Sequence, residues 1–351
     1  MKNHFEIKNA TFLANKQKTI KNVSFKIQKK GSIICLLGPS GVGKTTILRT
    51  IAGLNKLNSG EIILNGKVIS SKQQFLEPEK RNIALSFQEN SLFPHKNVIE
   101  NINLGLERKY LKKKILSAKY LLDIFDLEEI KYKYPHEIST GESQRVSIAR
   151  ALISSPELLL LDEPFSNIDQ ILRLKLQEKI KKIVSKTKIS TIVVTHDPNE
   201  AFYLGDKCGV VINGKLEQFD TPYNLYHYPN SMEIVNFFKK GALIPATVVG
   251  KNELFQKELG KITGNFVKDF KKGTQVKLLI QPDDLEHDDS SNLKLIVVEK
   301  KFRGTDFIYT LKTKNNLKIP VLVHSHHIHQ HDIKEKFGIK LPIHINHLVC
   351  F

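Results

Sequence analysis

Short apolar segments alternate with longer segments of helical character along the first part of the chain. The apolar runs in SIICLLG (Ser32–Gly38) and ELLLLDE (Glu157–Glu163) have the length of buried strands. Strands that alternate with helices in this way are typical of a largely parallel sheet. The pattern therefore predicts an α/β domain over residues 1–240.

The pattern changes after NFFKKG (Asn236–Gly241). Short β-like runs follow, among them QVKLLIQPDDL, NLKLIVVEKKF and TDFIYTLKTKN, and they are separated by Gly, Asn and Asp. This spacing predicts a small all-β barrel or sandwich. We place the boundary near residue 240, which leaves residues 241–351 as a second, β-rich domain.

No apolar run approaches the roughly 18 residues that a membrane-spanning helix requires. The N-terminal MKNHFEIKNA lacks a charged head followed by an apolar stretch, so we expect no signal peptide. The cysteines Cys35, Cys208 and Cys350 are scattered and odd in number, which indicates a reducing cytosol and no disulfides.

The formal net charge of +18 admits two interpretations. A basic surface can bind nucleic acid, or it can simply be solvated and face water or anionic lipid. The excess is spread over both domains, and only seven of the 54 basic residues are Arg, the type best suited to bidentate phosphate contacts. We favour the solvated surface and expect no nucleic-acid partner.

The segment GPSGVGKTT fits the P-loop pattern G-x-x-x-x-G-K-[ST], with an apolar strand before it and a helical segment after it. Its glycines allow backbone N–H groups to surround phosphate oxygens at a helix N-terminus. Lys44 is expected to reach the β- and γ-phosphates, and the Thr45 hydroxyl to ligate Mg²⁺. The predicted nucleotide-binding residues here are Gly38, Pro39, Ser40, Gly41, Val42, Gly43, Lys44, Thr45 and Thr46.

Two carboxylates follow the second apolar strand. Asp162 is placed to hold the metal ion, directly or through water, and Glu163 to orient and polarise the attacking water. Carboxylates after an apolar run can also merely cap a strand. The P-loop upstream favours the catalytic interpretation.

The segment ISTGESQRVSIARAL (Ile138–Leu152) resembles the LSGGQ signature of ABC ATPases. Three further segments resemble motifs of that superfamily in the same order. Gln88 in LSFQENSLFPH is similar to the Q-loop, SNID (Ser166–Asp169) to the D-loop, and His196 in TIVVTHD to the switch histidine. The resemblance covers roughly residues 5–238.

The resemblance implies a sandwich homodimer. Each ATP would lie on the Lys44 loop of one subunit and be covered by the other subunit's signature. Ser139 and the backbone around Gly141 would contact the γ-phosphate, and Glu142 and Asp169 would complete the nucleotide-binding set.

The resemblance also implies how the site is coupled to transport. His196 would grip the γ-phosphate and position water together with Glu163. Gln88 would sense Mg²⁺ and connect the site to a helical subdomain over about residues 88–150, which docks on integral-membrane permease subunits. Closure of the dimer would gate hydrolysis.

Two positions depart from the family pattern. The first glycine of the signature is Thr140, whose backbone is less free to adopt positive φ. The aromatic residue that stacks on adenine has no clean counterpart. Phe12 is the nearest candidate, and the alternative is that Phe12 is a core residue.

The β-rich tail, which is similar to OB- or TOBE-like domains, resembles those of importer ATPases for ferric iron, polyamines, sulfate, molybdate and sugars. KYPHEIS, TPYNLYHYP and LLIQPDDL look most like the ferric-iron branch, although Gln281 stands where Arg commonly precedes the proline. An extracytoplasmic solute-binding protein is then an indirect partner. The expected place is the cytoplasmic face of the inner membrane.

A histidine-rich tract, HSHHIHQHD, lies near the C-terminus. It holds His324, His326, His327, His329 and His331, and His344 and His347 follow. Imidazoles at this density can bind Zn²⁺, Fe²⁺ or Cu²⁺, and alternate residues of a strand share a face, so His327, His329 and His331 could converge as a metal sensor. A solvated loop is the simpler interpretation, and we favour it.

An import motor is thus the leading hypothesis. A stand-alone ABC ATPase of DNA repair, translation or regulation is the alternative, but such proteins carry two ATPase domains or a long coiled-coil insertion. An exporter ATPase is disfavoured by the β-rich tail. No N-K-x-D motif follows the P-loop, which argues against a GTPase.

Overall fold

The computed structural model describes residues 3–13, 19–87, 91–106, 116–166, 168–239, 241–326 and 330–351. The chain forms two compact units, Met1–Leu225 and Tyr226–Phe351. The first is α/β and the second is built mainly of strands, as the hydrophobic pattern predicts. Within the described residues no helix combines the length and apolar character needed to cross a bilayer.

A ten-stranded sheet organises the first unit, in the order β5-β4-β1-β2-β10-β9-β3-β8-β7-β6. Its parallel part comprises β3 (Ile33–Leu37), β6 (Ile83–Ser86), β7 (Leu158–Asp162), β8 (Ser190–Thr195) and β9 (Lys207–Ile212). Its antiparallel part comprises β1 (Phe5–Leu13), β2 (Thr19–Ile27), β4 (Ser59–Leu64) and β5 (Lys67–Ser71). Strand β10 (Lys215–Asp220) joins the two parts.

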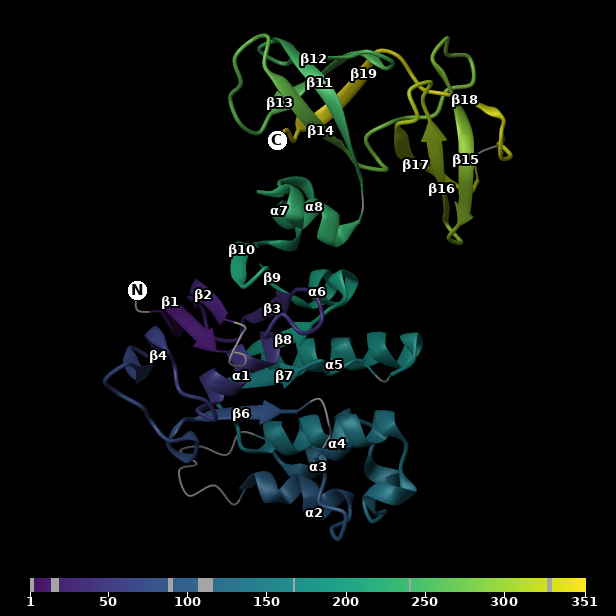
Figure 1. The fold of residues 1–351 in the computed structure, drawn as a ribbon. Helices are drawn as coiled ribbons and strands as arrows, with labels where there is room; N and C mark the ends of the chain where they lie inside the picture. The colour runs from purple at the N-terminus through teal and green to yellow at the C-terminus, as the bar shows by residue number, and fades with distance from the viewer. Residues whose placement is uncertain are drawn as a thin grey trace. The chain divides into compact units, whose positions relative to one another are not determined.

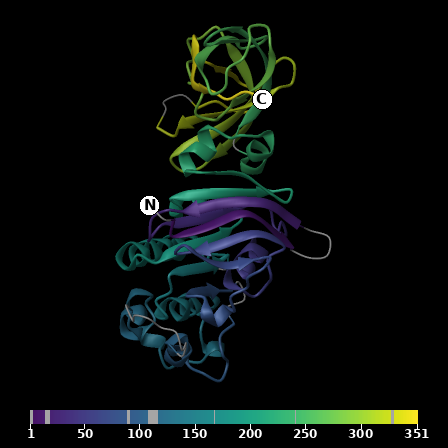
Figure 2. The ribbon, with the colours of Figure 1, turned by 90° about the vertical axis from the view of Figure 1, so that its left-hand side faces the viewer.

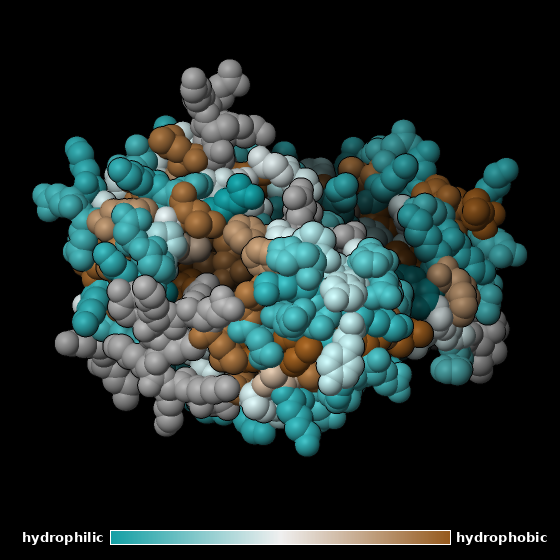
Figure 3. Space-filling view, turned by 90° about the horizontal axis from the view of Figure 1, so that it is seen from below, coloured by the Kyte–Doolittle hydropathy of each residue, from teal (hydrophilic) through white to brown (hydrophobic). Residues whose placement is uncertain are grey.

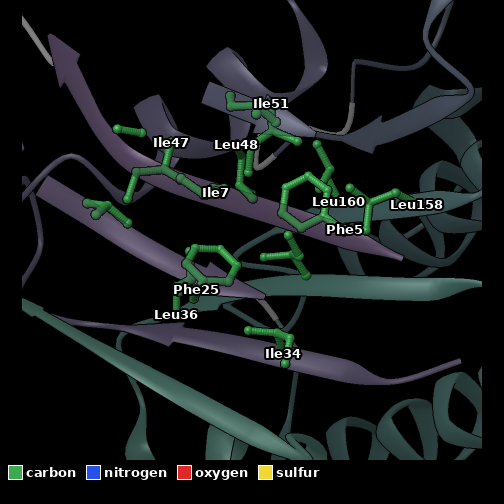
Figure 4. Close-up of a cluster of buried hydrophobic side chains, with 14 of the residues drawn as sticks. Phe5, Ile7, Phe25, Ile34, Leu36, Ile47, Leu48, Ile51, Leu158 and Leu160 are labelled. Atoms are coloured by element: carbon green, nitrogen blue, oxygen red, sulfur yellow. The ribbon is translucent and has the colours of Figure 1, made fainter. Parts of the chain in front are cut away.

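Helix α1 (Lys44–Ala52) packs between the two parts of this sheet. Figure 4 shows Ile47, Leu48 and Ile51 of α1 next to Phe5 and Ile7 of β1 and to side chains of β3 and β7. Burial of such side chains removes apolar surface from water at about 25 cal/mol per Å². The core therefore holds α1 firmly against the strand ends that flank it.

The helical part of the first unit lies beyond β6, away from the purple N-terminal strands (Figures 1 and 2). It contains α2 (Val98–Asn103), α3 (Ala118–Ile124) and α4 (Thr140–Ile153), with short 3₁₀ turns at Leu104–Leu106, Glu128–Ile130 and Pro135–Glu137. A further 3₁₀ turn spans Pro78–Lys80. Helices α5 (Gln170–Thr187) and α6 (Pro198–Leu204) follow β7 and β8.

The second unit contains two sheets that share one hydrophobic core. The first has the order β14-β11-β12-β13-β19 and comprises β11 (Ala242–Gly250), β12 (Glu253–Gln256), β13 (Gly260–Phe266), β14 (Gln275–Ile280) and β19 (Ile343–Leu348). The second has the order β17-β16-β15-β18 and comprises β15 (Lys294–Phe302), β16 (Asp306–Lys312), β17 (Lys318–His324) and β18 (Lys336–Gly338).

The boundary between the two units lies between Leu225 and Tyr226. It precedes the change in the hydrophobic pattern of the sequence near residue 240. Helix α7 (Pro222–His227) spans this point, and α8 (Met232–Phe238) follows it. Val235 of α8 packs with Leu279 and Val349 of the second unit. Because this contact buries apolar surface, α8 belongs with the β-rich unit even though its sequence is helical.

Candidate nucleotide site

The ends of three neighbouring parallel strands define the candidate site. Leu37, the last residue of β3, pairs with Thr195 of β8, and Asp162, the last residue of β7, pairs with Val194. The segments that follow these strands therefore leave the sheet at one edge. This edge brings together the P-loop, the Asp162–Glu163 turn and His196.

The P-loop adopts a conformation that requires its glycines. Gly38, Gly41 and Gly43 have φ values of 157°, 74° and 106°. A Cβ at Gly38 would lie 2.2 Å from the carbonyl oxygen of Val211. Pro39, Ser40 and Gly41 are exposed, and Val42 donates its N–H to the Pro39 carbonyl. The loop is thus open to a ligand on its outer side, and it leads into α1 at Gly43.

Lys44 folds back under the loop. Its Nζ donates to the carbonyl oxygens of Gly38 at 2.7 Å and Pro39 at 2.9 Å. Burial lowers the pKa of Lys44, and the charges of Glu163 and Asp162 partly oppose this shift. An ammonium held by neutral carbonyls can exchange them for phosphate oxygens without leaving its pocket. Thr46, the last predicted residue of this motif, lies in the first turn of α1, where its carbonyl accepts from Thr50.

Thr45 and Asp162 form the candidate metal-binding pair. The Thr45 hydroxyl donates to Oδ1 of Asp162 at 3.1 Å. Neighbouring ligands of octahedral Mg²⁺ at 2.0–2.1 Å lie about 2.9 Å apart, so this pair fits two adjacent positions of such an ion. Burial raises the pKa of Asp162, and the hydrogen bond from Thr45 opposes that rise. A cation at this position would favour the ionised carboxylate.

Glu163 and His196 face each other at the same edge. His196 Nδ1 lies 3.3 Å from Glu163 Oε2, and the His196 side chain is 54% exposed. Glu163 has a φ of 44°, a backbone conformation that is uncommon for a residue with a side chain. Its N–H donates to the Val194 carbonyl, which holds this turn against β8.

The backbone around His196 depends on residues that the sequence analysis did not single out. Thr195 donates its hydroxyl to the buried carboxylate of Glu200 and accepts the N–H of Asp197. Arg173 of α5 lies 3.4 Å from Glu200 and 3.7 Å from Asp197. These contacts hold both neighbours of His196 in place. For Thr195, Asp197 and Glu200 the only sequence signal was their proximity to His196 in THDPNEA, and Arg173 had none.

The signature residues lie at the start of α4. Ser139 is the N-cap, and it forms a capping box with Glu142 through hydrogen bonds of 2.7, 2.9 and 3.2 Å. Partial burial raises the pKa of Glu142, but the hydrogen bonds from Ser139 outweigh it, so the pKa is lowered overall. Thr140 is the first residue of the helix, so the positive φ considered above is not needed there. A Cβ at Gly141 would meet no described atom of this chain within 4 Å.

Three predicted site residues remain, namely Asp169, Phe12 and Gln88. Asp169 caps α5 and accepts from the N–H groups of Ile171 and Leu172. Phe12 is fully buried in the core beside α1, so it offers no face to an adenine ring and the stacking role is wrong in this structure. Gln88 lies outside the described residues.

The fold and the residues gathered at this edge of the sheet define a nucleotide-binding ATPase of the P-loop class. The ABC transporter family model matches residues 20–166. The Fe(3+) ions import ATP-binding protein FbpC of Haemophilus influenzae (strain 86-028NP) is 39% identical over 261 residues, 73% of each chain. The Spermidine/putrescine import ATP-binding protein PotA of Borrelia garinii subsp. bavariensis is 36% identical over 302 residues, 85% of each. The Mycoplasma capricolum PotA is 33% identical over 343 residues, 96% of this chain and 95% of that protein.

Solved structures agree in fold. A dimeric, post-hydrolysis structure of the ATP-binding cassette MJ0796 with ADP and Pi has a TM-score of 0.54 and 28% identity, covering 62% of this chain and 98% of that one. The cbiO1 structure from Clostridium perfringens has a TM-score of 0.55 at 23% identity, with coverages of 67% and 95%. The chain belongs to the ABC transporter family, as an ATP-binding subunit of importer type with a C-terminal β domain.

Proposed function

We propose that two copies of this chain hydrolyse ATP·Mg²⁺ between them and drive import through separate membrane subunits, with ferric iron as the first candidate cargo. The observation that carries the hydrolytic part is the convergence of Lys44, Thr45–Asp162 and Glu163–His196 at one sheet edge. In this proposal Lys44 binds the phosphates, and Thr45 and Asp162 hold the metal ion. Glu163 accepts the proton of the attacking water, and His196 orients it.

The dimer is supported by the position of the signature. Ser139 and Glu142 hydrogen-bond to each other at the start of α4, and a Cβ at Gly141 would meet no described atom of the chain within 4 Å. A helix N-terminus favours an anion, so a second copy could present its nucleotide phosphates to this turn. The dimeric structure of the ATP-binding cassette MJ0796 supports the same arrangement.

A docking surface for membrane subunits is proposed on the helical part. Figure 1 places α2 at the lower end of the first unit, and the view from below shows hydrophobic side chains between hydrophilic ones (Figure 3). Phe93, Tyr132 and Tyr134, which flank α2 and α4 in sequence, are 46%, 71% and 41% exposed. Exposed aromatic residues of this kind suit a protein partner better than water.

The cargo is proposed from kinship alone, since the motor does not touch it. Ferric iron is favoured by the 39% identity to an Fe(3+) import protein. Polyamines are the second candidate, because the PotA relatives match a larger share of the chain, up to 96%, and so include most of the C-terminal unit.

Uptake of labelled solutes in a strain without this gene tests both the import role and the proposed cargo. Labelled ferric iron and labelled spermidine are followed side by side, and the strain is complemented with wild type or with Glu163→Gln. Loss of iron uptake that only the wild type restores supports the first candidate. Loss of spermidine uptake alone supports the second, and unchanged uptake of both contradicts the two cargo assignments.

A further inference from the structure

Three side chains of the C-terminal unit converge within that unit. His287 and Asp289 lie between β14 and β15, and His331 lies between β17 and β18. His287 Nε2 is 2.8 Å from His331 Nε2 and 2.9 Å from Asp289 Oδ1. His331 Nε2 is 3.0 Å from the same Asp289 oxygen.

Protons cannot satisfy all three contacts at once. A ring nitrogen carries either one hydrogen or one lone pair, and an ionised carboxylate only accepts. If both histidines donate to Asp289, two N–H groups face each other over 2.8 Å. If one histidine donates to the other, the acceptor nitrogen faces the carboxylate with a lone pair. A cation resolves this conflict, because it receives a lone pair from each of the three atoms.

The distances fit such an ion. For a triangle of this size, a cation about 2.1 Å from each atom would lie about 1.3 Å out of their plane, which is the geometry of three ligands with an open side. Two imidazoles and one carboxylate are the donor set that suits Zn²⁺, Fe²⁺, Ni²⁺ or Cu²⁺ and disfavours Mg²⁺ and Ca²⁺.

The surroundings hold the ligands in place. The side chains of His287 and His331 are 4% and 11% exposed, and their rings lie 4.4 and 5.0 Å from the ring of Phe337. Asp289 is 38% exposed and gives the cluster a side toward solvent. The other ring nitrogen of His331, Nδ1, lies 4.0 Å from Glu335 Oε2, a carboxylate placed where metal-bound histidines often have one.

We propose that His287, Asp289 and His331 bind one first-row divalent transition-metal ion, which clamps the β14–β15 connection to the β17–β18 connection. The site differs from the sensor considered in the sequence analysis. Of those tract histidines, His327 and His329 lie outside the described residues, and the described partners of His331 in the site lie outside the tract. The proposal does not depend on the cargo or on ATP hydrolysis.

Titration of the metal-free, full-length protein with Zn²⁺, in a buffer without Mg²⁺ and nucleotide, tests it. We expect one ion per chain by calorimetry, and a rise in Tm of the wild type. His287→Gln, Asp289→Asn and His331→Gln should each weaken binding at least tenfold. Exposed tract residues supply the matched control, since His324→Gln combined with His326→Gln should bind as the wild type does.

Far-UV circular dichroism and ATP hydrolysis without Zn²⁺ verify that each variant is folded. Asp289→Asn is the mildest change because its side chain is the most exposed of the three. Zn²⁺ affinity that survives in a folded His287→Gln variant, or that is lost in the control, would assign the ion to the histidine tract and overturn the proposal. Absence of binding to the wild type would overturn it as well.

Discussion

His196 Nδ1 lies 3.3 Å from Oε2 of Glu163, although the two residues follow different strands, β8 and β7. The pairing of Asp162 with Val194 brings these strand ends into register, and the contacts of Thr195 and Glu200 hold the turn that carries His196. The arrangement places a carboxylate and an imidazole where both can reach one water molecule.

Glu163→Gln should abolish hydrolysis and retain nucleotide binding. The amide keeps the shape of the side chain but cannot accept a proton, and loss of a general base costs about 10²- to 10⁴-fold in rate. Phosphate release measures the rate, and calorimetry with ATP measures binding. A rate within threefold of the wild type would show that Glu163 is not the base.

Lys44→Ala and Gly141→Asp should each inactivate the protein and yet rescue each other. The first removes the ammonium proposed to bind the phosphates, and the second adds a charged side chain whose Cβ would meet no described atom of the same chain within 4 Å. Mixed dimers contain one intact P-loop facing one intact signature, so random mixing restores up to about a quarter of the sites.

Rescue is measured by mixing the two purified variants and following ATP hydrolysis. Thermal unfolding of Gly141→Asp alone should match the wild type, because a Cβ at Gly141 would meet no described atom of its own chain within 4 Å. If the mixture stays as inactive as its components, the signature does not serve a partner's nucleotide.

Arg81→Met should destabilise the first unit by about 2–4 kcal/mol. The buried guanidinium donates to Leu76 O at 2.6 Å and to Thr50 O and Ile51 O at the end of α1. Burial lowers the pKa of Arg81 to about 10, so the group remains charged at neutral pH. Methionine leaves these carbonyls without their donor.

Urea unfolding checks this prediction, and Lys80→Met is the matched control. Lys80 is exposed, so its replacement should change the free energy of unfolding by no more than about 0.5 kcal/mol. Equal effects of the two substitutions would contradict a structural role for Arg81.

The C-terminal unit should lose stability as the pH rises through about 7. Burial raises the pKa of Asp284 from 3.8 to about 7, and the N–H of Gln281 opposes this shift at 2.6 Å. The folded state therefore binds the proton more tightly than the unfolded state. Its contribution is fully present below about pH 4 and decreases until the pH exceeds 7, by a few kcal/mol at most.

Asp284→Asn isolates this effect. Asparagine keeps an oxygen for the Gln281 N–H and carries no charge, so the variant should exceed the wild type in Tm by more at pH 8 than near pH 5. A Tm difference that does not change between these two pH values would show that Asp284 does not titrate as described.

The local sequence pattern was sufficient to predict those parts of the molecule whose conformation depends on few neighbouring residues. The all-apolar runs at β3 and β7 are buried on both faces, so their sequence alone identified them as strands of a parallel sheet. The glycines of the P-loop were recognisable because positive φ admits few other residues. The resemblance of the ordered motifs led to the family, and the comparisons confirmed it.

Other features depend on contacts between residues far apart in the chain, and local pattern could not reveal them. Phe12 proved to be a core residue because β1 packs against α1, and α8 joined the second unit because Val235 meets Leu279 and Val349. Likewise, nothing in the sequence singles out His287 and Asp289 as neighbours of His331.

The sequence by itself thus determined the family, the order of the motifs and the chemistry available to each, since these follow from residue type and short spacing. Folding decided which side chains meet, and whether a given ring is exposed to a ligand or enclosed in a core. The reason is physical: long-range packing of β1 on α1 buries Phe12. A β-bridge between His287 and Ile339, just after β18, joins two loops in which the Nε2 atoms of His287 and His331 lie 2.8 Å apart.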